Sequence, residues 1–583
     1  MTRPRGASED ELGFRPQEAV RWLAPRVLVS TGVQSVIASI FGSYADKREL
    51  QGSLPAEVHR FTRVGDGAEG ERDFWFDYVA DLGDGFDATY SVATLLGAES
   101  VELPGVGALP RGELLVMGGD EVYPSASTRA YEDRTKGVYR AALPEATGTP
   151  PTLFALPGNH DWYDGLTSFL RVFGQKRAIG GWQTAQSRSY FAIELPRRWW
   201  LFAIDTQFDD YVDGPQLQYF REAAQELRPG DAVILCTPAP DWVDAGSGRE
   251  AGKYDTIEFF DREVVRPRGA DIRVMLSGDK HHYARYAEQG GDRQRITAGH
   301  GGAYLAATHE LPKALTLPPP ASRVRQKSPA RDFALVERYP SKRTSERFAA
   351  GIFQLPWRNP GFWALTGTFQ TLMTLAVLYG LVETLGERSD KGFFGLVATW
   401  TPAVAVAAVL LVGGVTFAKI ERFHGGRVAT AFGLVHALLH IGLSVGWSFV
   451  VIYLYTRVLP PGVVDDWATL VVVLVGTPVL IGLVDAELVA LYLMVASRFG
   501  INLNEVMAGQ SIEDHKGFLR LRIDAAGDLV IHAVKLDEVG RKWRADPDAP
   551  AHAPWLVPAR PLRPALIEPP IRVPRVSADA GAG

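Results

Sequence analysis

The distribution of apolar positions divides the chain into two parts of different character. Beyond Pro360 the sequence contains four long apolar segments, at about residues 362–384, 393–417, 429–456 and 467–497. Each is longer than the roughly 20 residues that an α-helix needs to cross a bilayer. Aromatic residues typical of membrane interfaces lie near their ends, namely Trp363, Trp400, Tyr453, Tyr455 and Trp467. The pattern predicts four transmembrane helices over 362–497.

Before residue 310 the apolar runs are short and bounded by turn residues, as in buried β-strands. They include 73–80, 114–117, 153–156, 201–204 and 272–276. Acidic, amide or imidazole residues follow these runs closely. Open α/β sheets build their sites at the carboxyl ends of strands, so these polar residues are the candidates for chemistry. The pattern predicts an α/β domain over 61–310.

The segments around these two parts carry weaker signals. Residues 18–41 predict an amphipathic helix, packed on the α/β domain or lying on the membrane surface. Alternating residues at 518–523 and 529–534 predict a β-hairpin. The expected domain order is an N-terminal helical region (1–60), the α/β domain (61–310), an irregular juxtamembrane linker (311–361), the transmembrane helices (362–497), a small β-containing module (498–545) and an extended Pro- and Ala-rich tail (546–583).

Four strand ends carry strings that suit metal chemistry. They are Asp81-Leu82-Gly83, Gly119-Asp120-Glu121-Val122-Tyr123, Gly158-Asn159-His160-Asp161 and Gly278-Asp279-Lys280-His281. A bridging aspartate with an asparagine oxygen, backed by imidazole, suits hard or borderline divalent cations. A single Gly-Asp string is an ordinary turn, but several at strand ends of one domain indicate a two-metal hydrolytic centre.

The order of these strings resembles the calcineurin-like metallophosphoesterase superfamily, and most closely its purple-acid-phosphatase-like branch. That branch carries DxG, GDxxY, GNH[DE], VxxH and GHxH in this order, and the first three are matched within roughly residues 70–305. The resemblance implies an αββα-type sandwich that hydrolyses phosphoesters. It also implies two divalent or mixed-valence metal ions, drawn from Mn, Fe, Mg and Zn.

The same resemblance implies roles for individual residues. The implied ligands are Asp81, Asp120, Tyr123 and His281 for one metal ion, and Asp120, Asn159 and Asp279 for the other. His160 would face the substrate and stabilise or protonate the leaving group, with Asp161 orienting its ring. His282 and His300 are candidates for phosphate contact, and His300 fits a structural turn equally well.

Two motifs depart from the family pattern. Cys236 stands where VxxH requires a histidine, and Asp279 stands where GHxH requires its first histidine. An alternative register of VxxH places Pro238, which cannot ligate, at that position. Both departures fall on the second metal ion, which is then expected to be weakly held and Mn- or Mg-like, or absent. Cys236 fits a small buried hydrophobe better than a ligand, and Asp84 is a less favoured alternative ligand.

These departures leave two other functions open beside an active enzyme. One is a catalytically weak phosphoesterase-fold sensor or scaffold that regulates the membrane bundle. The other, less favoured, is a transporter or channel regulated by the soluble domain.

Charge and cysteine content restrict location and partners. The net charge of −6 gives no basic field that would recruit nucleic acid. A single Cys suits a reducing compartment, and residues 1–14 lack the apolar core of a secretory signal. The loop after the second apolar segment carries the bases Lys419, Arg422 and Arg427, which predict a cytoplasmic loop. The loop after the third carries the acids Asp465 and Asp466, which predict an external one. We therefore expect a multi-pass membrane protein with both termini and the α/β domain in the cytoplasm.

The expected partners follow from this location. They are membrane lipid and a phosphomono- or diester substrate, for which the membrane region favours a lipid-linked or membrane-delivered molecule. The sequence leaves the oligomeric state open.

Ionisable residues occur inside two of the apolar segments. His436 and His440 lie one turn apart in the third, and Asp485 and Glu487 lie in the fourth. His440 is 13 residues beyond Arg427, and Asp485 is 13 residues before Arg498, so both lie about 20 Å from the cytoplasmic flank. The two helices are antiparallel, so the pair can meet. Two interpretations follow: polar contacts that hold helices together, or a proton- or metal-linked site.

Overall fold

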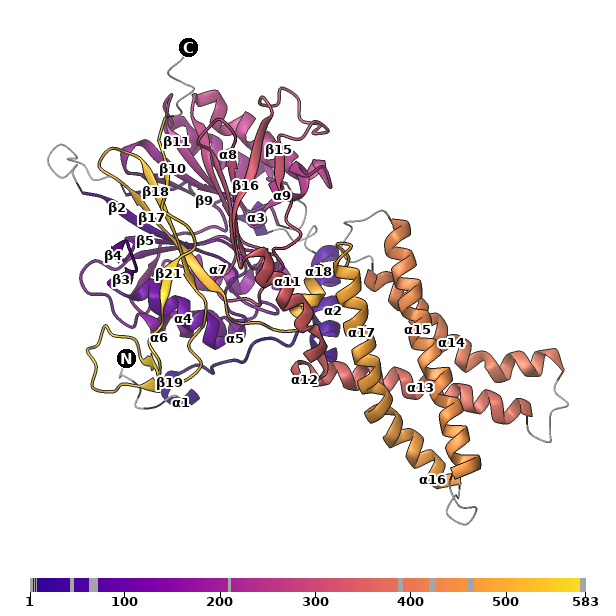
Figure 1. Ribbon diagram of the computed structural model, residues 1–583. Coiled ribbons are helices and arrows are strands. Elements are labelled where there is room, and N and C mark those ends of the chain that lie inside the picture. The colour runs from indigo at the N-terminus through magenta and orange to yellow at the C-terminus, as the bar shows by residue number, and fades with distance from the viewer. Residues whose placement is uncertain are drawn as a thin grey trace. The chain divides into compact units, whose positions relative to one another are not determined.

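The computed structural model describes residues 4, 6, 8–41, 47–61, 72–207, 211–385, 392–418, 426–458 and 466–576 (Figure 1). Its contacts divide the chain into two compact units. The first, which we call the sheet unit, comprises Met1–Val20, Ser30–Lys342 and Ile512–Gly583. The second, the helical unit, comprises Arg21–Val29 and Arg343–Ser511. The chain therefore contributes a short segment to the helical unit near its N-terminus, and later leaves the sheet unit again to form the rest of the helical unit before it returns.

The sheet unit contains two nine-stranded sheets. The first has the order β1 (Val58–Arg60), β9 (Phe191–Leu195), β10 (Trp199–Ala203), β11 (Ala232–Cys236), β12 (Asp271–Ser277), β14 (Gln294–Ala298), β13 (Tyr283–Glu288), β16 (Arg331–Tyr339) and β15 (Ala314–Leu317). Strands β10, β11, β12 and β14 are parallel. Their carboxyl ends therefore lie at one edge of this sheet.

The second sheet is built from both ends of the chain. Its order is β21 (Pro564–Leu566), β18 (Leu529–Leu536), β17 (Lys516–Ile523), β2 (Phe74–Val79), β5 (Leu114–Met117), β6 (Thr152–Ala155), β8 (Trp182–Thr184) and β7 (Ala178–Ile179), with β22 (Ile571–Val573) also paired to β18. Strands β2, β5 and β6 are parallel. The strands expected at 73–80, 114–117 and 153–156 are thus confirmed.

Buried side chains order the layers of the sheet unit. Alternate residues of both sheets, such as Phe76, Leu201 and Ile234, form one core between the sheets. The opposite face of the second sheet packs against α4 (Phe86–Gly97), α6 (Gly137–Ala142) and α7 (Thr167–Phe173). The opposite face of the first sheet packs against α8 (Gly214–Ala223), α9 (Asp241–Gly246) and α10 (Asp255–Phe260). Helices therefore cover both outer faces of a pair of packed sheets.

The C-terminal hairpin differs from the expected separate module at 498–545. Strand β17 pairs with β2 along the register Leu519↔Tyr78, and Figure 1 shows yellow β17 and β18 beside indigo β2. Arg520 is fully buried and forms hydrogen bonds of 2.8 and 3.0 Å with the carboxylate of Asp77. The alternating pattern predicted the strands correctly, but it says nothing about their neighbour, which precedes them by more than 400 residues.

Two further domain boundaries are corrected by the structure. The segment 311–361 is not an irregular linker, because β15 and β16 within it extend the first sheet, and Phe333 and Leu315 are buried there. The tail beyond Asp546 is not simply extended: β20 (Leu556–Pro558) pairs with β19 (Trp543–Ala545), and β21 and β22 pair with β18. Exposed bases and prolines concealed these short strands in the sequence. At the N-terminus, the expected helix at 18–41 begins at Pro25 as α2 (Pro25–Phe41).

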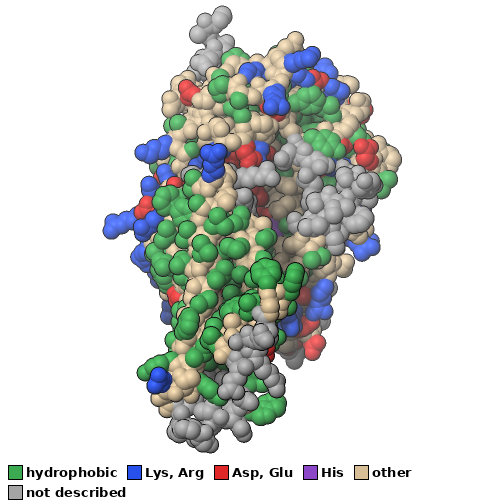
Figure 2. Space-filling view, turned by 90° about the vertical axis from the view of Figure 1, so that its right-hand side faces the viewer, with side chains coloured by type: hydrophobic (Ala, Val, Ile, Leu, Met, Phe, Trp, Pro, Cys, Tyr) green, Lys and Arg blue, Asp and Glu red, His purple; other side chains and the backbone are tan. Residues whose placement is uncertain are grey.

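The helical unit contains four helices long and apolar enough to cross a membrane. These spans are Pro360–Leu385 (α13), Phe393–Ala418 (α14), Gly426–Val458 and Val473–Ser497. The third span comprises α15 (Gly426–Tyr453) and η9 (Leu454–Val458), and the fourth comprises most of η10 (Val472–Ile481) and α17 (Gly482–Ser497). Short helices α11 (Lys342–Ala350), α12 (Leu355–Arg358), α16 (Asp466–Val471) and α18 (Leu503–Ala508) flank them. Many apolar side chains on the spans are exposed, including Phe394, Val404 and Val475, and Figure 2 shows hydrophobic side chains spread over this unit. Such a surface suits lipid rather than water.

The four predicted spans are thus confirmed as apolar helices. Lys419, Arg422 and Asp465, on which the orientation depends, lie outside the described residues. The cytoplasmic placement of the termini stays a prediction.

Candidate functional site

The predicted strand-end residues gather where the two sheets meet. Asp81 follows β2 and Asp120 follows β5, so both lie at the same edge of the second sheet. Asp279 follows β12 of the first sheet, and its backbone N–H donates to Asp81 Oδ1 over 2.8 Å. The backbone N–H of Leu82 in turn donates to the Asp120 carbonyl over 2.7 Å. One site is therefore built from three strand ends of two different sheets.

The three aspartates share an unusual backbone conformation. Asp81, Asp120 and Asp279 have φ angles of 59°, 53° and 64°, in the left-handed region. That region costs a non-glycine residue roughly 1–2 kcal/mol. Residues persist there only where the surrounding structure determines them, and such residues cluster at functional sites.

Asp120 organises the centre of the cluster. Its Oδ1 accepts the backbone N–H of His160 at 2.9 Å, and its Oδ2 accepts the Tyr123 hydroxyl at 3.0 Å. The Tyr123 oxygen also lies 3.0 Å from His281 Nε2. Because the hydroxyl proton goes to Asp120, His281 donates through Nε2–H, which leaves Nδ1 as the acceptor nitrogen. Asp120, Tyr123, His160 and His281 therefore form one hydrogen-bonded group.

The carboxylates of this group repel one another in a buried setting. Burial raises the pKa of Asp81 well above its ordinary value, and Asp120 and then Asp279 add to the effect. Burial likewise raises the pKa of Asp120, reinforced by Asp161 and Asp279. Burial opposes ionisation of Asp279 too, but Lys280, 2.9 Å away, holds the pKa of that carboxyl below its usual value. A cation would relieve this repulsion.

The donor atoms fit such a cation. Among the described residues, Asp81 Oδ2 and His281 Nδ1 are buried without a hydrogen-bond partner. Glycines leave room around the carboxylates: a Cβ at Gly299 would lie 2.0 Å from Asp81 Oδ2, and one at Gly158 would lie 2.1 Å from Asp120 Oδ1. Oxygen and imidazole donors of this kind suit Mn²⁺, Mg²⁺, Zn²⁺ or iron.

The side chains are not, however, arranged as a finished metal site. Within the described ranges, no three His, Cys, Asp or Glu side chains lie in position to hold a single metal ion. Instead the Tyr123 hydroxyl lies between Asp120 and His281. Metal binding would exchange these hydrogen bonds for ligand bonds.

His160 lies beside the aspartates with its ring fixed by the backbone. Its Nδ1 lies 2.7 Å from the carbonyl oxygen of Pro124, so Nδ1–H donates there and Nε2 carries the lone pair. The rings of Tyr123 and Tyr163 lie 4.5 and 4.9 Å from it, centroid to centroid. Burial lowers the pKa of His160 to about 4, so the ring is neutral at neutral pH.

Asp161 differs from its expected role. Its Oδ2 accepts the backbone N–H groups of Gly158 and Glu121, at 2.8 and 3.3 Å, and its Oδ1 accepts the Tyr131 hydroxyl. Asp161 therefore ties the two loops after β5 and β6 together, and the Pro124 carbonyl orients His160 in its place. A backbone acceptor of this kind leaves no signal in the sequence.

The remaining candidates are distributed differently. Asn159 is half-buried, and its side-chain N–H donates to the Tyr163 hydroxyl over 3.4 Å. His282 is buried next to the cluster, and burial, with Lys280 and Arg338, lowers its pKa to about 3. Metal ligation by Asn159 and phosphate contact by His282 stay predictions.

Three other side chains have surroundings that favour structural roles. The His300 ring packs against Gly517 of β17: a Cβ added at Gly517 would lie 2.7 Å from His300 Nε2. This close packing favours the structural role over phosphate contact. Cys236 lies in the apolar core between the sheets, and burial raises the pKa of its thiol. The carboxylate of Asp84 accepts the backbone N–H groups of Val20 and Tyr304, at 2.7 and 2.9 Å. Cys236 is therefore a core residue and Asp84 a turn residue, and neither is placed as a ligand.

Two residues at the site were not singled out from the sequence. Glu121 is fully buried beside Asp161, and burial and then Asp161 raise its pKa well above the ordinary value. The ring of Tyr304 stands edge-on to His281 at 4.4 Å. Glu121 occupies a variable position of GDxxY and Tyr304 belongs to no motif, so neither carried a signal.

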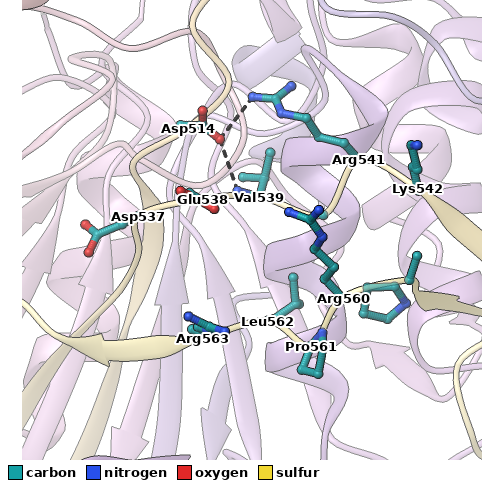
Figure 3. A pocket seen from close by; sticks show the side chains of 13 residues that line it. Asp514, Asp537, Glu538, Val539, Arg541, Lys542, Arg560, Pro561, Leu562 and Arg563 are labelled. Atoms are coloured by element: carbon teal, nitrogen blue, oxygen red, sulfur yellow. Dashed lines mark hydrogen bonds and ion pairs between the residues drawn. The ribbon is translucent and has the colours of Figure 1, made fainter.

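A cavity of about 780 Å³ also lies in the sheet unit, lined by C-terminal residues between Asp514 and Arg563 (Figure 3). None of the strand-end residues lines it. Arg541 there is paired with Glu513 and Asp514, at 3.2 and 3.0 Å. The functional site is therefore assigned to the strand ends and not to this cavity.

Comparisons with known proteins add little to this geometry. No protein-family model matches the sequence, and no curated protein is similar to it. A solved structure, a purple acid phosphatase from yellow lupin (Lupinus luteus) seeds, aligns with 42% of this chain and 46% of its own at 11% identity and a TM-score of 0.27. The chain thus spans less than half of that protein's length.

Proposed function

We propose that the sheet unit is a metal-dependent phosphoesterase of the αββα metallophosphoesterase type. The observation that carries the proposal is the cluster of Asp81, Asp120 and Asp279 in left-handed backbone at three strand ends, with Asp81 and Asp120 buried and Asp279 partly exposed. His281 and His160 complete it. Repelling carboxylates with uncommitted donor atoms are costly without a cation, so their retention in one place supports a metal centre.

The ligands divide between two positions. Asp81, Tyr123 and His281 would hold one ion, Asn159 and Asp279 the other, with Asp120 shared. When bound, two such ions polarise a phosphoryl oxygen and lower the pKa of water to near neutral. Asp120 would suit the bridge because its carboxylate lies against Gly158 and close enough to Asp81 and Asp279 for the charges to interact.

His160 would move the proton in this proposal. With Nδ1–H donating to the Pro124 carbonyl, Nε2 carries the lone pair that would accept a proton and return it to the leaving oxygen. Lys280, half exposed at 2.9 Å from Asp279, supplies positive charge beside the site for a phosphate.

The membrane region suggests where the substrate is found. An enzyme attached to apolar helices acts on phosphoesters near the bilayer surface, and a lipid-linked phosphomono- or diester is the class we propose. The cytoplasmic face follows from the loop charges alone.

A phosphoesterase-fold sensor with weak or no catalysis is the second candidate. It is favoured by Cys236, which fills a ligand position of the family pattern and lies in the apolar core. In that case the function would be regulation of the helical unit and not catalysis by the sheet unit.

One experiment separates the two. Full-length protein in detergent is assayed for bound metal by mass spectrometry and for hydrolysis of p-nitrophenyl phosphate and its bis-ester, with and without added Mn²⁺ or Mg²⁺. We expect metal-dependent turnover, lost together with metal in Asp120→Asn. Asp73→Asn, at the opposite end of β2, is the matched control and should keep both. Bound metal without turnover would favour the sensor. The absence of both bound metal and turnover would refute the enzyme.

A further inference from the structure

A row of polar side chains lies inside the helical unit. His436, His440, Ser444 and Ser448 recur every fourth residue of α15, and all four are buried. Residues on the other side of this helix, such as Leu438, are exposed and apolar. Groups of this kind within membrane-spanning helices are costly and mark functional positions by default.

The histidines and Asp485 form a linear chain. His440 Nδ1 contacts Asp485 Oδ1 of α17, which confirms the contact expected from their matching depths. The other nitrogen of His440, Nε2, lies 2.8 Å from His436 Nε2. Two lone pairs or two N–H groups would repel at that distance, so one proton lies between the rings.

The chain ends in an unsatisfied atom. Among the described residues, His436 Nδ1 is buried and has no hydrogen-bond partner. The His436 ring is 5% exposed and is stacked on Tyr492, with centroids 3.9 Å apart and planes 4° from parallel. An orphaned polar atom in an apolar interior costs about 1–3 kcal/mol. Contacts that merely hold helices together do not require such an atom.

The neighbouring elements contribute few other titratable groups. Helix α13 presents Gln370, whose side-chain N–H donates to the His440 carbonyl over 3.3 Å. Helix α14, over its described span, has no titratable residue and presents Phe417. Helix α17 presents Asp485 and Tyr492, and Tyr492 leads through Asn502 to Glu505 of α18, over 2.9 and 3.2 Å. Among the described residues on these helices, the titratable groups near His440 are therefore Asp485, His436 and, through Asn502, the pair Tyr492 and Glu505.

The geometry does not suit a metal ion. The two nitrogens of His440 point at different partners, so the three side chains do not converge on one point, and no metal-binding group occurs among the described residues. A line of alternating donors and acceptors is instead the arrangement through which a proton moves.

We propose that His436, His440 and Asp485 form a proton-binding site in the membrane-spanning helices, with His436 Nδ1 as the entry atom. Without the proton, His436 Nε2–H donates to His440 Nε2, and His440 Nδ1–H donates to the Asp485 carboxylate. When a proton binds at His436 Nδ1, the Nε2 proton passes to His440 and the Nδ1 proton of His440 passes to Asp485. Every hydrogen bond reverses, and the triad changes from a charge of −1 to neutral. The site is independent of the proposed phosphoesterase.

Infrared difference spectroscopy on the full-length protein in lipid vesicles tests this directly. Lowering the pH should produce the C=O stretching band of a protonated carboxyl together with changes in histidine ring bands. The carboxyl band should shift on ¹³C-aspartate labelling and should be lost in Asp485→Asn. The matched control is Glu487→Gln. Glu487 lies two residues further along α17 and lines a separate apolar groove with Leu438 and Leu491. That variant should keep the band.

The relay itself is tested by His436→Gln. Removing the entry atom should move the midpoint of the Asp485 band by about one pH unit or more, as expected for coupled sites. If Asp485→Asn does not fold, Asp485→Glu replaces it and should shift the band instead of removing it. A pH series without an Asp485 band, or a midpoint unchanged in His436→Gln, would overturn the proposal.

Discussion

At the residue scale, the site depends on how little space surrounds the carboxylates. Gly158, Gly278 and Gly299 stand against Asp81 and Asp120 so closely that any side chain would displace a carboxylate oxygen. None of these three glycines has a positive φ angle, so their role is to permit close approach rather than an unusual backbone. A change of one methyl group is therefore a sharp probe of the site.

Gly299→Ala is expected to abolish metal binding while the sheets remain folded. Its Cβ would lie 2.0 Å from Asp81 Oδ2, so the carboxylate must turn away. Metal content and thermal melting of the full-length protein measure the two effects separately. Gly252→Ala, whose Cβ would meet nothing within 4 Å, is the control. A variant that keeps its metal would mean that Asp81 is not a ligand.

His160→Ala is expected to slow turnover by roughly 10²–10⁴-fold while metal stays bound. The reason is that its ring is held by the Pro124 carbonyl, while its hydrogen bond to Asp120 comes from the backbone N–H, which alanine retains. Turnover and metal stoichiometry are measured on the same preparation. Loss of metal in this variant would reassign His160 as a ligand.

The motifs predicted where residues lie, but not which way each side chain turns. Asp81, Asp120 and His281 meet because a strand end fixes the position of the next few residues. Asp161 and His300 follow equally regular positions, yet Asp161 accepts backbone N–H groups and the His300 ring packs against a glycine of β17. Such partners depend on the packing of distant segments, which one sequence does not display.

At the element scale, strand β17 decides whether the second sheet is complete. It pairs with β2 on one side and β18 on the other, so the parallel strands that carry Asp81 and Asp120 depend on a hairpin from the far end of the chain. Sequence periodicity predicted both strands of the hairpin. It could not predict their partner, because Arg520 and Asp77 are 443 residues apart and each looks like an ordinary surface charge in its own segment.

Arg520→Met is expected to destabilise the sheet unit by about 3–5 kcal/mol, because the buried Asp77 carboxylate would lose its ion-pair partner. Thermal unfolding followed by near-ultraviolet circular dichroism measures the loss. The control is Arg572→Met, an exposed pair with Asp524 and Asp528, which should melt close to the wild type. Recovery of stability in Arg520→Met with Asp77→Leu would establish that the unpaired charge is the cause.

At the scale of the whole molecule, the interrupted sheet unit restricts the topology. Strands from before and after the helical unit share one sheet, so both must lie on the same side of a membrane. This requires an even number of spans, and the four apolar helices satisfy it. Loop charge is needed only to decide which side of the membrane the sheet unit occupies.

The charge pattern then predicts that the sheet unit is cytoplasmic. Lys419, Arg422 and Arg427 lie between the second and third spans, while Asp465 and Asp466 lie between the third and fourth. A reporter fused after Gly583 should therefore be active only as a cytoplasmic reporter, and one inserted at Gly462 only as an external one. Reversing the loop charges at 419, 422 and 427 to Glu should weaken this preference without changing the number of spans. If the two reporters lay on the same side of the membrane, the count of four spans would be wrong. If both assignments were reversed, the count would stand, and the substrate would have to be sought outside the cytoplasm.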